Sequence, residues 1–370
     1  MWKLPDATAQ RFPLIARPRP ACLPLAQRVH GLTELADTAA KSMDPSAAST
    51  VYNQAALIAS DIGAPDDAHA MCRRHASAYL HAAPLPGKTA IRALEPVVNL
   101  ARLQIRAGYA DEGRQHLLTL YDAVSTGTPA QFEDIAVPAD LTASAEDRRE
   151  VRAWLWRVLL ADGTRTLTAA GRWAEALAHI EEHRGIGQRM FDGRQVAVLA
   201  ALTSGDTLAA EDLLACTEQR EPWERAVTSC LTVLCRRATG QPFHHRLKDL
   251  VATYLGYADK QGMTVFNARL GLTVLAAIPS PKAPAARRVV AELHRRVTEA
   301  TDGYAAREVL TCPAFTALVT TREAQDCHAL LRVCALGAGA FPTDLHDEVK
   351  AAICASDRVI RNSVAVPTGR

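Results

Sequence analysis

Apolar residues recur three and four positions apart along most of this chain, and glycines or prolines interrupt the pattern at intervals. This spacing places the apolar side chains on one face of an α-helix. A glycine between two such segments ends a helix without steric cost, because it adopts the left-handed conformation readily. The pattern predicts an all-α protein built from helices at residues 45–62, 66–80, 89–106, 110–124, 155–168, 226–239, 243–257, 265–277, 285–300, 305–318, 322–336 and 344–361.

The clearest repetition lies between residues 155 and 223. Gly171, in Ala-Ala-Gly-Arg-Trp-Ala-Glu-Ala-Leu, and Gly205, in Thr-Ser-Gly-Asp-Thr-Leu-Ala-Ala, are 34 residues apart, and Gly240 follows after another 35. Further corners are predicted at Gly63 and Gly108. A fixed interval of this length is typical of stacked helical hairpins, in which each pair of helices packs against the next pair.

Residues at fixed offsets from these glycines resemble the tetratricopeptide repeat family. The first copy has Trp173 two positions after its glycine, Ala176 five after and Ile180 nine after. The second copy keeps a small and a large apolar residue at the last two of these offsets and ends on a proline, Pro222. The resemblance implies an α-solenoid of antiparallel helical hairpins with a C-terminal helical cap.

Composition shifts along the chain predict its organisation. Residues 1–24 carry several prolines and predict an extended N-terminal arm, followed by a helical repeat array at 25–278. Residues 285–361 predict C-terminal helices beyond a proline-rich hinge at 279–284, and residues 362–370 a frayed tail. Residues 125–142 predict a long connection without regular structure. Such a segment is either a binding loop that covers a groove or an ordered loop packed on the surface, and both interpretations stay open.

The overall composition narrows the class of protein. Hydrophobic residues make up 48% of the chain and aromatic residues only 5%, which favours closely packed helices. A net charge of +2 does not indicate a nucleic-acid surface. The nine cysteines are scattered without a C-x-x-C pair and are predicted to be buried in a reducing compartment. With neither a signal peptide nor a membrane span expected, the sequence predicts a cytoplasmic protein without membrane or nucleic-acid partners.

The tetratricopeptide resemblance also implies a concave groove, lined by the first helix of each pair, that holds peptides. Counting back from each turn glycine places these polar residues on or near that face: Asn53, Asn99, Arg102, Arg106, Asp162, Arg165, Gln195 and Arg237. Asparagine and glutamine pair with both the donor and the acceptor of an extended backbone, and arginine holds carboxylates. We therefore expect a non-catalytic binding or scaffold subunit that holds a peptide or partner protein and needs no cofactor. An ordinary solvated face is the alternative.

Histidines supply the candidates for chemistry. His179 and His183 belong to an H-x-x-E-H motif and lie one helical turn apart, as two metal ligands would, but no third ligand is identifiable and no metal site is predicted. His69, Cys72 and His75 also share helical spacing. They could hold zinc or an activated thiolate, although core packing is favoured because free cysteine is among the most often buried residues.

A second resemblance gives an alternative function. The run from residue 139 through residue 197 is similar to stand-alone helical-repeat proteins of actinobacteria, some of which accompany enzymes that modify ribosomal peptides. This resemblance implies a component of a multi-enzyme peptide-maturation system, such as a lanthionine-forming cyclase acting with kinase-like and lyase subunits. Ring closure needs a base to form a cysteine thiolate and an acid to protonate the enolate, for which the candidates are His69, His75, His179 and His183.

Overall fold

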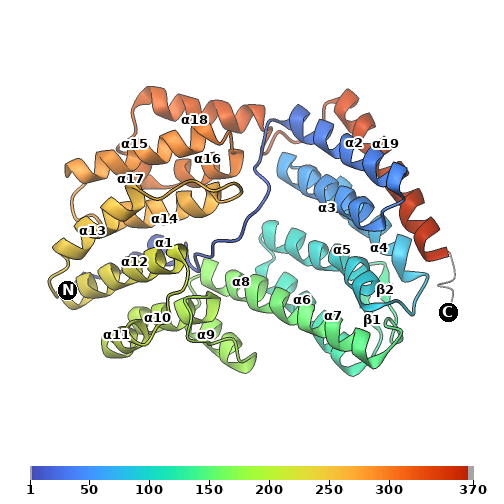
Figure 1. Ribbon diagram of the computed structural model, residues 1–370, viewed down its shortest axis with the longest axis horizontal. Helices are drawn as coiled ribbons and strands as arrows, with labels where there is room; N and C mark the ends of the chain where they lie inside the picture. The colour runs from blue at the N-terminus through green and yellow to red at the C-terminus, as the bar shows by residue number, and fades with distance from the viewer. Residues whose placement is uncertain (1, 366–370) are drawn as a thin grey trace. The chain divides into compact units, whose positions relative to one another are not determined.

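The computed structural model describes residues 2–365 and confirms an all-α protein (Figure 1). Among these residues, the only sheet is a two-stranded hairpin. The chain forms two compact units. Unit 1 contains residues 2–24 and 164–334, and unit 2 contains residues 25–163 and 335–365.

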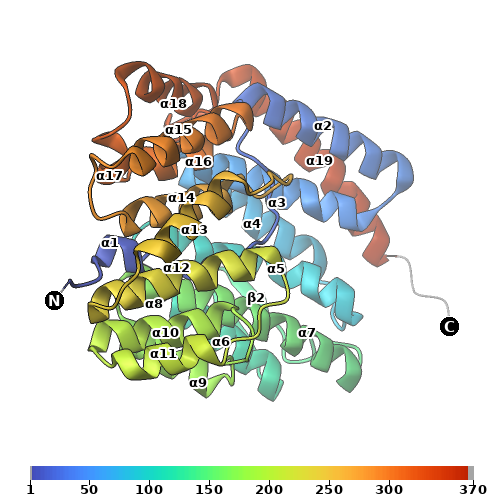
Figure 2. The same cartoon turned by 60° about the vertical axis from the view of Figure 1, so that its left-hand side comes forward.

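Unit 2 is a series of helices in which each packs against the next along the chain. In addition, α3 packs against α5 and α5 against α7, so that alternate helices form a common layer. The C-terminal helix α19 lies beside α2 and α3 (Figure 2). The helices are α2 (Leu25–Ser42), α3 (Pro45–Ile62), α4 (Pro65–Leu80), α5 (Gly87–Arg106), α6 (Ala110–Thr126), α7 (Ala145–Val158), the π-helical turn η1 (Leu159–Gly163) and α19 (Thr343–Ala365).

Unit 1 follows the same packing order. Helix α10 contacts α9, α11 and α12, and α14 contacts α12, α15 and α16. Residues 2–24 contain only the short helix α1 (Asp6–Ala9). The other helices are α8 (Thr164–Ala169), α9 (Trp173–Glu182), α10 (Asp192–Ser204), α11 (Thr207–Ala215), α12 (Pro222–Thr239), α13 (His244–Leu255), α14 (Thr264–Ala277), α15 (Pro284–Glu299), α16 (Gly303–Leu310), α17 (Pro313–Thr316) and α18 (Thr321–Val333).

The predicted glycine corners are confirmed. Gly171 and Gly205 have φ angles of 73° and 88°, a region that a Cβ atom would make costly. Gly63, Gly108 and Gly240 share this left-handed conformation. The chain therefore turns between helices where the sequence pattern places its breaks.

Four expectations differ from the structure. The predicted helix at 305–318 is two helices, because Pro313 has no N–H to continue the first and instead begins α17. Pro222 likewise begins α12, since proline is favoured in a first helical turn, and does not end a repeat. The proline-rich stretch at 279–284 does not separate the units, because α14 packs directly on α15. Residues 362–365 of the predicted tail belong to α19, and residues 366–370 lie outside the described residues.

The connection at 125–142 also differs from its prediction as a structureless segment. Strands β1 (Ala130–Phe132) and β2 (Ile135–Val137) pair in antiparallel fashion within it. The apolar side chains of Phe132, Ile135 and Val137 are buried, and β1 packs against α6 while β2 packs against α4. Alternation of buried and exposed residues along each strand is what a two-sided hairpin on a helical surface requires.

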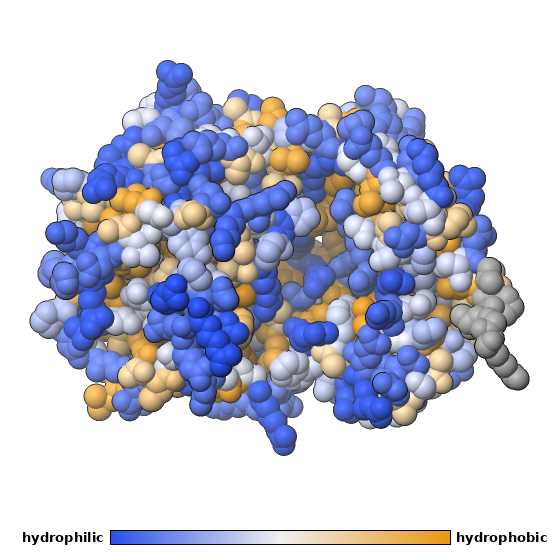
Figure 3. Space-filling view, viewed as in Figure 1, coloured by the Kyte–Doolittle hydropathy of each residue, from blue (hydrophilic) through white to orange (hydrophobic). Residues whose placement is uncertain are grey.

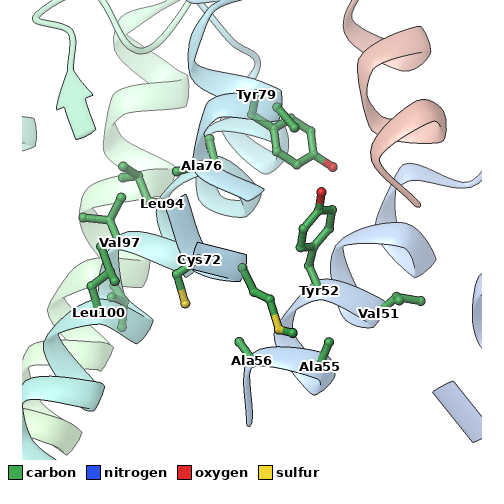
Figure 4. Packing of buried hydrophobic residues seen from close by; sticks show 14 of the residues in the cluster. Val51, Tyr52, Ala55, Ala56, Cys72, Ala76, Tyr79, Leu94, Val97 and Leu100 are labelled. Atoms are coloured by element: carbon green, nitrogen blue, oxygen red, sulfur yellow. The ribbon is translucent and has the colours of Figure 1, made fainter. Parts of the chain in front are cut away.

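Small residues and two tyrosines shape the core of unit 2. Figure 4 shows Tyr52 and Tyr79 facing one another from α3 and α4, with Ala55, Ala56 and Ala76 close by. Alanine lets helix axes approach closely, which is how a chain poor in aromatic residues fills its interior. The cysteines are free, and seven are buried as expected, while two are exposed: Cys216 and Cys354.

The surface of the molecule is predominantly hydrophilic on the face in Figure 3, with hydrophobic side chains between the polar ones. Within residues 2–365, no helix combines the length and the apolar content needed to traverse a bilayer.

Candidate peptide-binding faces

A continuous chain of hydrogen bonds joins α3, α5 and η1 in unit 2. Asn53 Nδ2 donates to Glu95 Oε2 (2.7 Å), and Asn53 Oδ1 accepts from Asn99 Nδ2 (3.0 Å). Asn99 Oδ1 accepts from Arg102 Nη1 (3.0 Å), and Arg102 Nε donates to Asp162 Oδ2 (2.9 Å). We call these five residues the polar ladder.

Helical spacing explains why the ladder exists. Glu95, Asn99 and Arg102 lie four and three residues apart on α5, so they share one face. The buried neighbours Leu94 and Val98 lie on the core side of the same helix. The ladder is half-buried at Asn53 and Asn99 and reaches solvent at Arg102, whose side chain is 47% exposed. Burial raises the pKa of Glu95, and the hydrogen bond from Asn53 partly offsets this.

Arg106 continues the polar face by one more turn of α5. Its Nη1 donates to Ser60 Oγ (2.9 Å) and to Asp61 Oδ1 (3.4 Å) at the end of α3. Asp61 is buried and also accepts from Arg28 Nη2 (2.6 Å). The Arg106 side chain is 48% exposed, so its guanidinium is fixed at one edge and open to a ligand at the other.

In unit 1, Gln195 bonds to the main chain of the N-terminal arm. Its Oε1 accepts from the Leu14 N–H (2.7 Å), and its Nε2 donates to Leu14 O (2.8 Å) and to Met190 O (2.9 Å). Gln195 and Leu14 are both fully buried. This is the two-sided pairing expected between an amide side chain and an extended peptide, made with a segment of the same chain.

Two further predicted residues contact the same arm. Arg165 Nη1 donates to the carbonyl oxygens of Arg11 (3.3 Å) and Pro13 (3.2 Å). Burial, together with the charge of nearby Arg269, lowers the pKa of Arg165 to about 10, which leaves it protonated at neutral pH. The Arg237 guanidinium lies 4.2 Å from the ring centroid of Trp2, at cation–π distance.

The eight predicted residues thus divide between two faces. Unit 2 holds Asn53, Asn99, Arg102, Arg106 and Asp162, and unit 1 holds Arg165, Gln195 and Arg237. Sequence reasoning missed Glu95, although it lies one turn before Asn99 and that spacing is a usable signal. It also missed Arg28 and Asp61, whose pairing joins α2 to α3 and has no signature along the chain.

The four candidate histidines also lie in both units. In unit 2, His69 Nδ1 is 3.4 Å from Glu133 Oε1, and His75 is fully buried and stacked on Tyr52 with ring centroids 4.8 Å apart. Burial lowers the pKa of His75 to about 3, so it stays neutral. In unit 1, the rings of His179 and His183 are 4.7 Å apart. Across residues 2–365, no three His, Cys, Asp or Glu side chains gather as a metal site requires.

The β-hairpin at 130–137 lies against α4 and α6. Arg73 of α4 contacts Glu133 (3.4 Å) and Asp134 (3.6 Å) at its tip. His116 of α6 stacks on Phe132, with ring centroids 4.3 Å apart. Of the two interpretations of residues 125–142, these contacts favour an ordered loop packed on the surface over a binding loop that covers the face formed by α3 and α5.

Comparison of the chain with models of protein families, with curated proteins and with solved structures finds no match. The fold and the two polar faces therefore define the class on their own: an all-α protein of successively packed helices, with amide and guanidinium groups on alternate helices.

Proposed function

We propose that this protein is a non-catalytic, tetratricopeptide-like binding or scaffold subunit that holds a peptide or partner protein in a groove lined by the first helices of its hairpins. The packing of α3 on α5 and of α5 on α7 supports this reading, because alternate helices then form one layer. The polar ladder lies on that layer. Rigid helices that carry many weak contacts are well suited to hold an extended segment.

The observation that carries the proposal is the bonding of Gln195 to Leu14. An amide on a first helix there holds both polar groups of an extended main chain. Asn53 and Asn99 have the same chemistry on the first helices of unit 2. Each asparagine amide has two N–H donors and two acceptor lone pairs, of which the ladder uses one donor and one lone pair. The second donor and lone pair suit the alternating groups of a peptide.

A display library of random peptides tests this function. We expect selection on the wild-type protein to enrich peptides whose affinity falls at least tenfold on Asn53→Ala with Asn99→Ala, because one lost main-chain pair is worth about 1.4 kcal/mol. The matched control is Gln115→Ala, an exposed amide of α6, which should leave the affinity unchanged. If enriched peptides bind the double variant as tightly as the wild type, the ladder is not the site.

The alternative function, a component of a peptide-maturation system, also requires the protein to bind a peptide, and in addition it requires proton transfer. The pair of His69 and Glu133 is the observation in its favour, since a half-exposed imidazole beside a carboxylate is a usable general base. In this case the protein would act within a multi-enzyme complex. The test is incubation with a dehydrated, cysteine-containing peptide and detection of free thiol by alkylation and mass spectrometry. Thiol loss that His69→Ala abolishes would support a cyclase, and no loss would leave the binding subunit.

A further inference from the structure

The N-terminal arm of unit 1 is bound in the way that a peptide ligand is bound. Residues 12–24 contain no helix or strand, and the four prolines among them have no N–H. Polar groups of their backbone bond to the helical part of unit 1 instead. Besides Leu14, the Arg19 N–H donates to Gly262 O (3.1 Å), the Cys22 N–H donates to Asp302 Oδ1 (3.1 Å), and Cys22 O accepts from the Gly303 N–H (2.8 Å).

These contacts come from successive parts of the helical array. Arg165 lies on α8, Gln195 on α10 and Arg237 on α12, while Gly262 precedes α14 and Asp302 precedes α16. Each supplies a contact to a different point of the arm. Because most are made to main-chain groups, they would form with any extended segment of suitable shape.

The side chains of the arm set its chemistry. Phe12 and Leu14 are fully buried, with no more than 1% of either exposed. Arg11 Nη1 donates to Leu272 O (3.4 Å), and Arg17 Nη2 contacts Asp192 Oδ2 (2.7 Å). After these anchors, residues 17–20 return to solvent. Residues 11–17 of the arm are therefore basic and contain no helix or strand, and they carry two apolar anchors two residues apart, Phe12 and Leu14.

We propose that unit 1 is a receptor for extended peptide segments, and that residues 2–24 occupy it as a tethered ligand. The partner that competes with the arm is an extended segment of another protein with the same chemistry: arginines flanking two apolar anchors separated by one residue. Tethering makes the arm's effective concentration high, so a partner must offer either higher affinity or several such segments. This receptor rests on the bonding of Gln195 to Leu14, as the proposed function does, but it lies in unit 1 and makes no use of the polar ladder of unit 2.

The proposal is tested by cleaving the arm from the protein and measuring whether an added peptide takes its place. A site-specific protease sequence is inserted between Pro18 and Arg19, within the exposed stretch 17–20. After cleavage, the protein is incubated with excess fluorescent peptide of residues 2–18 and then passed through a gel-filtration column. We expect close to one label per cleaved protein and at least tenfold less on uncleaved protein. Gln195→Ala should weaken the labelled peptide at least tenfold, whereas Arg106→Ala in unit 2 should not change its binding.

A measurement on the uncut chain covers the case in which the insertion disturbs folding. Hydrogen exchange of the wild-type protein is followed with and without excess peptide of residues 2–18. Displacement predicts faster exchange at the Leu14 amide, while α10 and α12 stay protected. If the cleaved protein takes up no labelled peptide, or loses its helical circular dichroism when its fragment leaves, the arm is an integral part of the core and the proposal is wrong. Whether unit 2 binds peptides through the polar ladder is decided separately, by the selection of peptides from the display library.

Discussion

In unit 1, the amide of Gln195 holds a main chain, whereas in unit 2 the amides of Asn53 and Asn99 hold each other. Both arrangements lie on helices that precede a left-handed glycine, which is Gly63 after α3, Gly108 after α5 and Gly205 after α10. They differ in burial, because Gln195 is 0% exposed and the asparagines are half-buried. They differ also in partner, because an extended segment of the chain passes Gln195 and a second amide faces Asn53.

The difference shows that an amide side chain on a helix before a turn glycine has two roles in this protein. A buried amide with a main-chain partner is part of the stability of its unit, since loss of either partner leaves a polar group without water. A half-exposed amide can exchange one partner for another at small cost, since water replaces whatever leaves. The first arrangement is therefore expected to be costly to disrupt unless another extended segment replaces the arm and makes the same hydrogen bonds, and the second to be cheap to disrupt.

The largest effect should follow Gln195→Leu, which keeps the volume and removes the hydrogen bonds. The N–H and C=O of Leu14 and the C=O of Met190 would each lose a buried partner. We expect the free energy of unfolding of unit 1 to fall by roughly 3–5 kcal/mol, measured by hydrogen exchange of α10 and α12. The paired control in unit 2, Asn99→Leu, should cost about 1 kcal/mol. Equal losses for both variants would remove the distinction between the faces.

The next largest effect should come from adding a methyl group at a closely packed glycine in each unit. The loss of stability in each variant compares how closely the two units are packed there. A Cβ added at Gly193 of α10 would lie 2.2 Å from Gly185 O, a backbone atom that cannot move alone. At Gly113 of α6, the added Cβ would lie 2.6 Å from Ala101 O, also a backbone atom but farther away than Gly185 O is from Gly193, and 2.6 Å from the side chain of Ile105, which can rotate. We expect Gly193→Ala to cost about 3 kcal/mol and Gly113→Ala about 1–2 kcal/mol, by urea denaturation. The reverse order would contradict this reading.

Acid should destabilise unit 2 by about 2 kcal/mol per buried histidine. Burial lowers the pKa of His75 to about 3 and that of His116 to about 4, both in unit 2. The unfolded chain, with histidine near 6.5, binds more protons below that pH, so the stability of unit 2 falls as the pH falls from about 6.5 towards 4. Hydrogen exchange at pH 7 and pH 5 measures the loss. His75→Phe with His116→Phe should abolish this pH dependence, and its persistence would assign it to other groups.

The fold was predictable because local signals agree with it. The five glycine corners are visible in the sequence, and the predicted helix at 45–62 has the bounds of α3. The structure departs from the prediction where the same residue fits two different structures. Pro313 continues the apolar pattern of the predicted helix at 305–318, yet it starts a new helix because it lacks an N–H. The hairpin at 130–137 is stabilised by contacts with α4 and α6, which no local pattern encodes.

The candidate site was predictable only as a list of residues. Counting back from the glycines selects first-helix positions such as Asn99 and Gln195, and both positions bear polar contacts in the structure. The division into two units depends on chain crossings after residues 24, 163 and 334, of which only the first coincides with a predicted boundary, the end of the arm. That the arm passes Gln195 depends on tertiary packing between Leu14 and Gln195, which are 181 residues apart. Periodicity describes neighbours along one helix and cannot report such a contact.

The smallest effect on stability should come from Arg102→Ala, and it is the sharpest test of the ladder. Arg102 is 47% exposed and its partner Asp162 is 27% exposed. An ion pair so open to solvent contributes less than about 1 kcal/mol, so urea denaturation should barely change. The affinity for peptides selected on the wild type should nevertheless fall about tenfold. Arg172→Ala, which removes an exposed pair with Glu175 in unit 1, is the matched control and should leave affinity unchanged. If Arg102→Ala instead lost much stability and kept its affinity for peptides, the ladder would hold the helices together and would not bind a peptide.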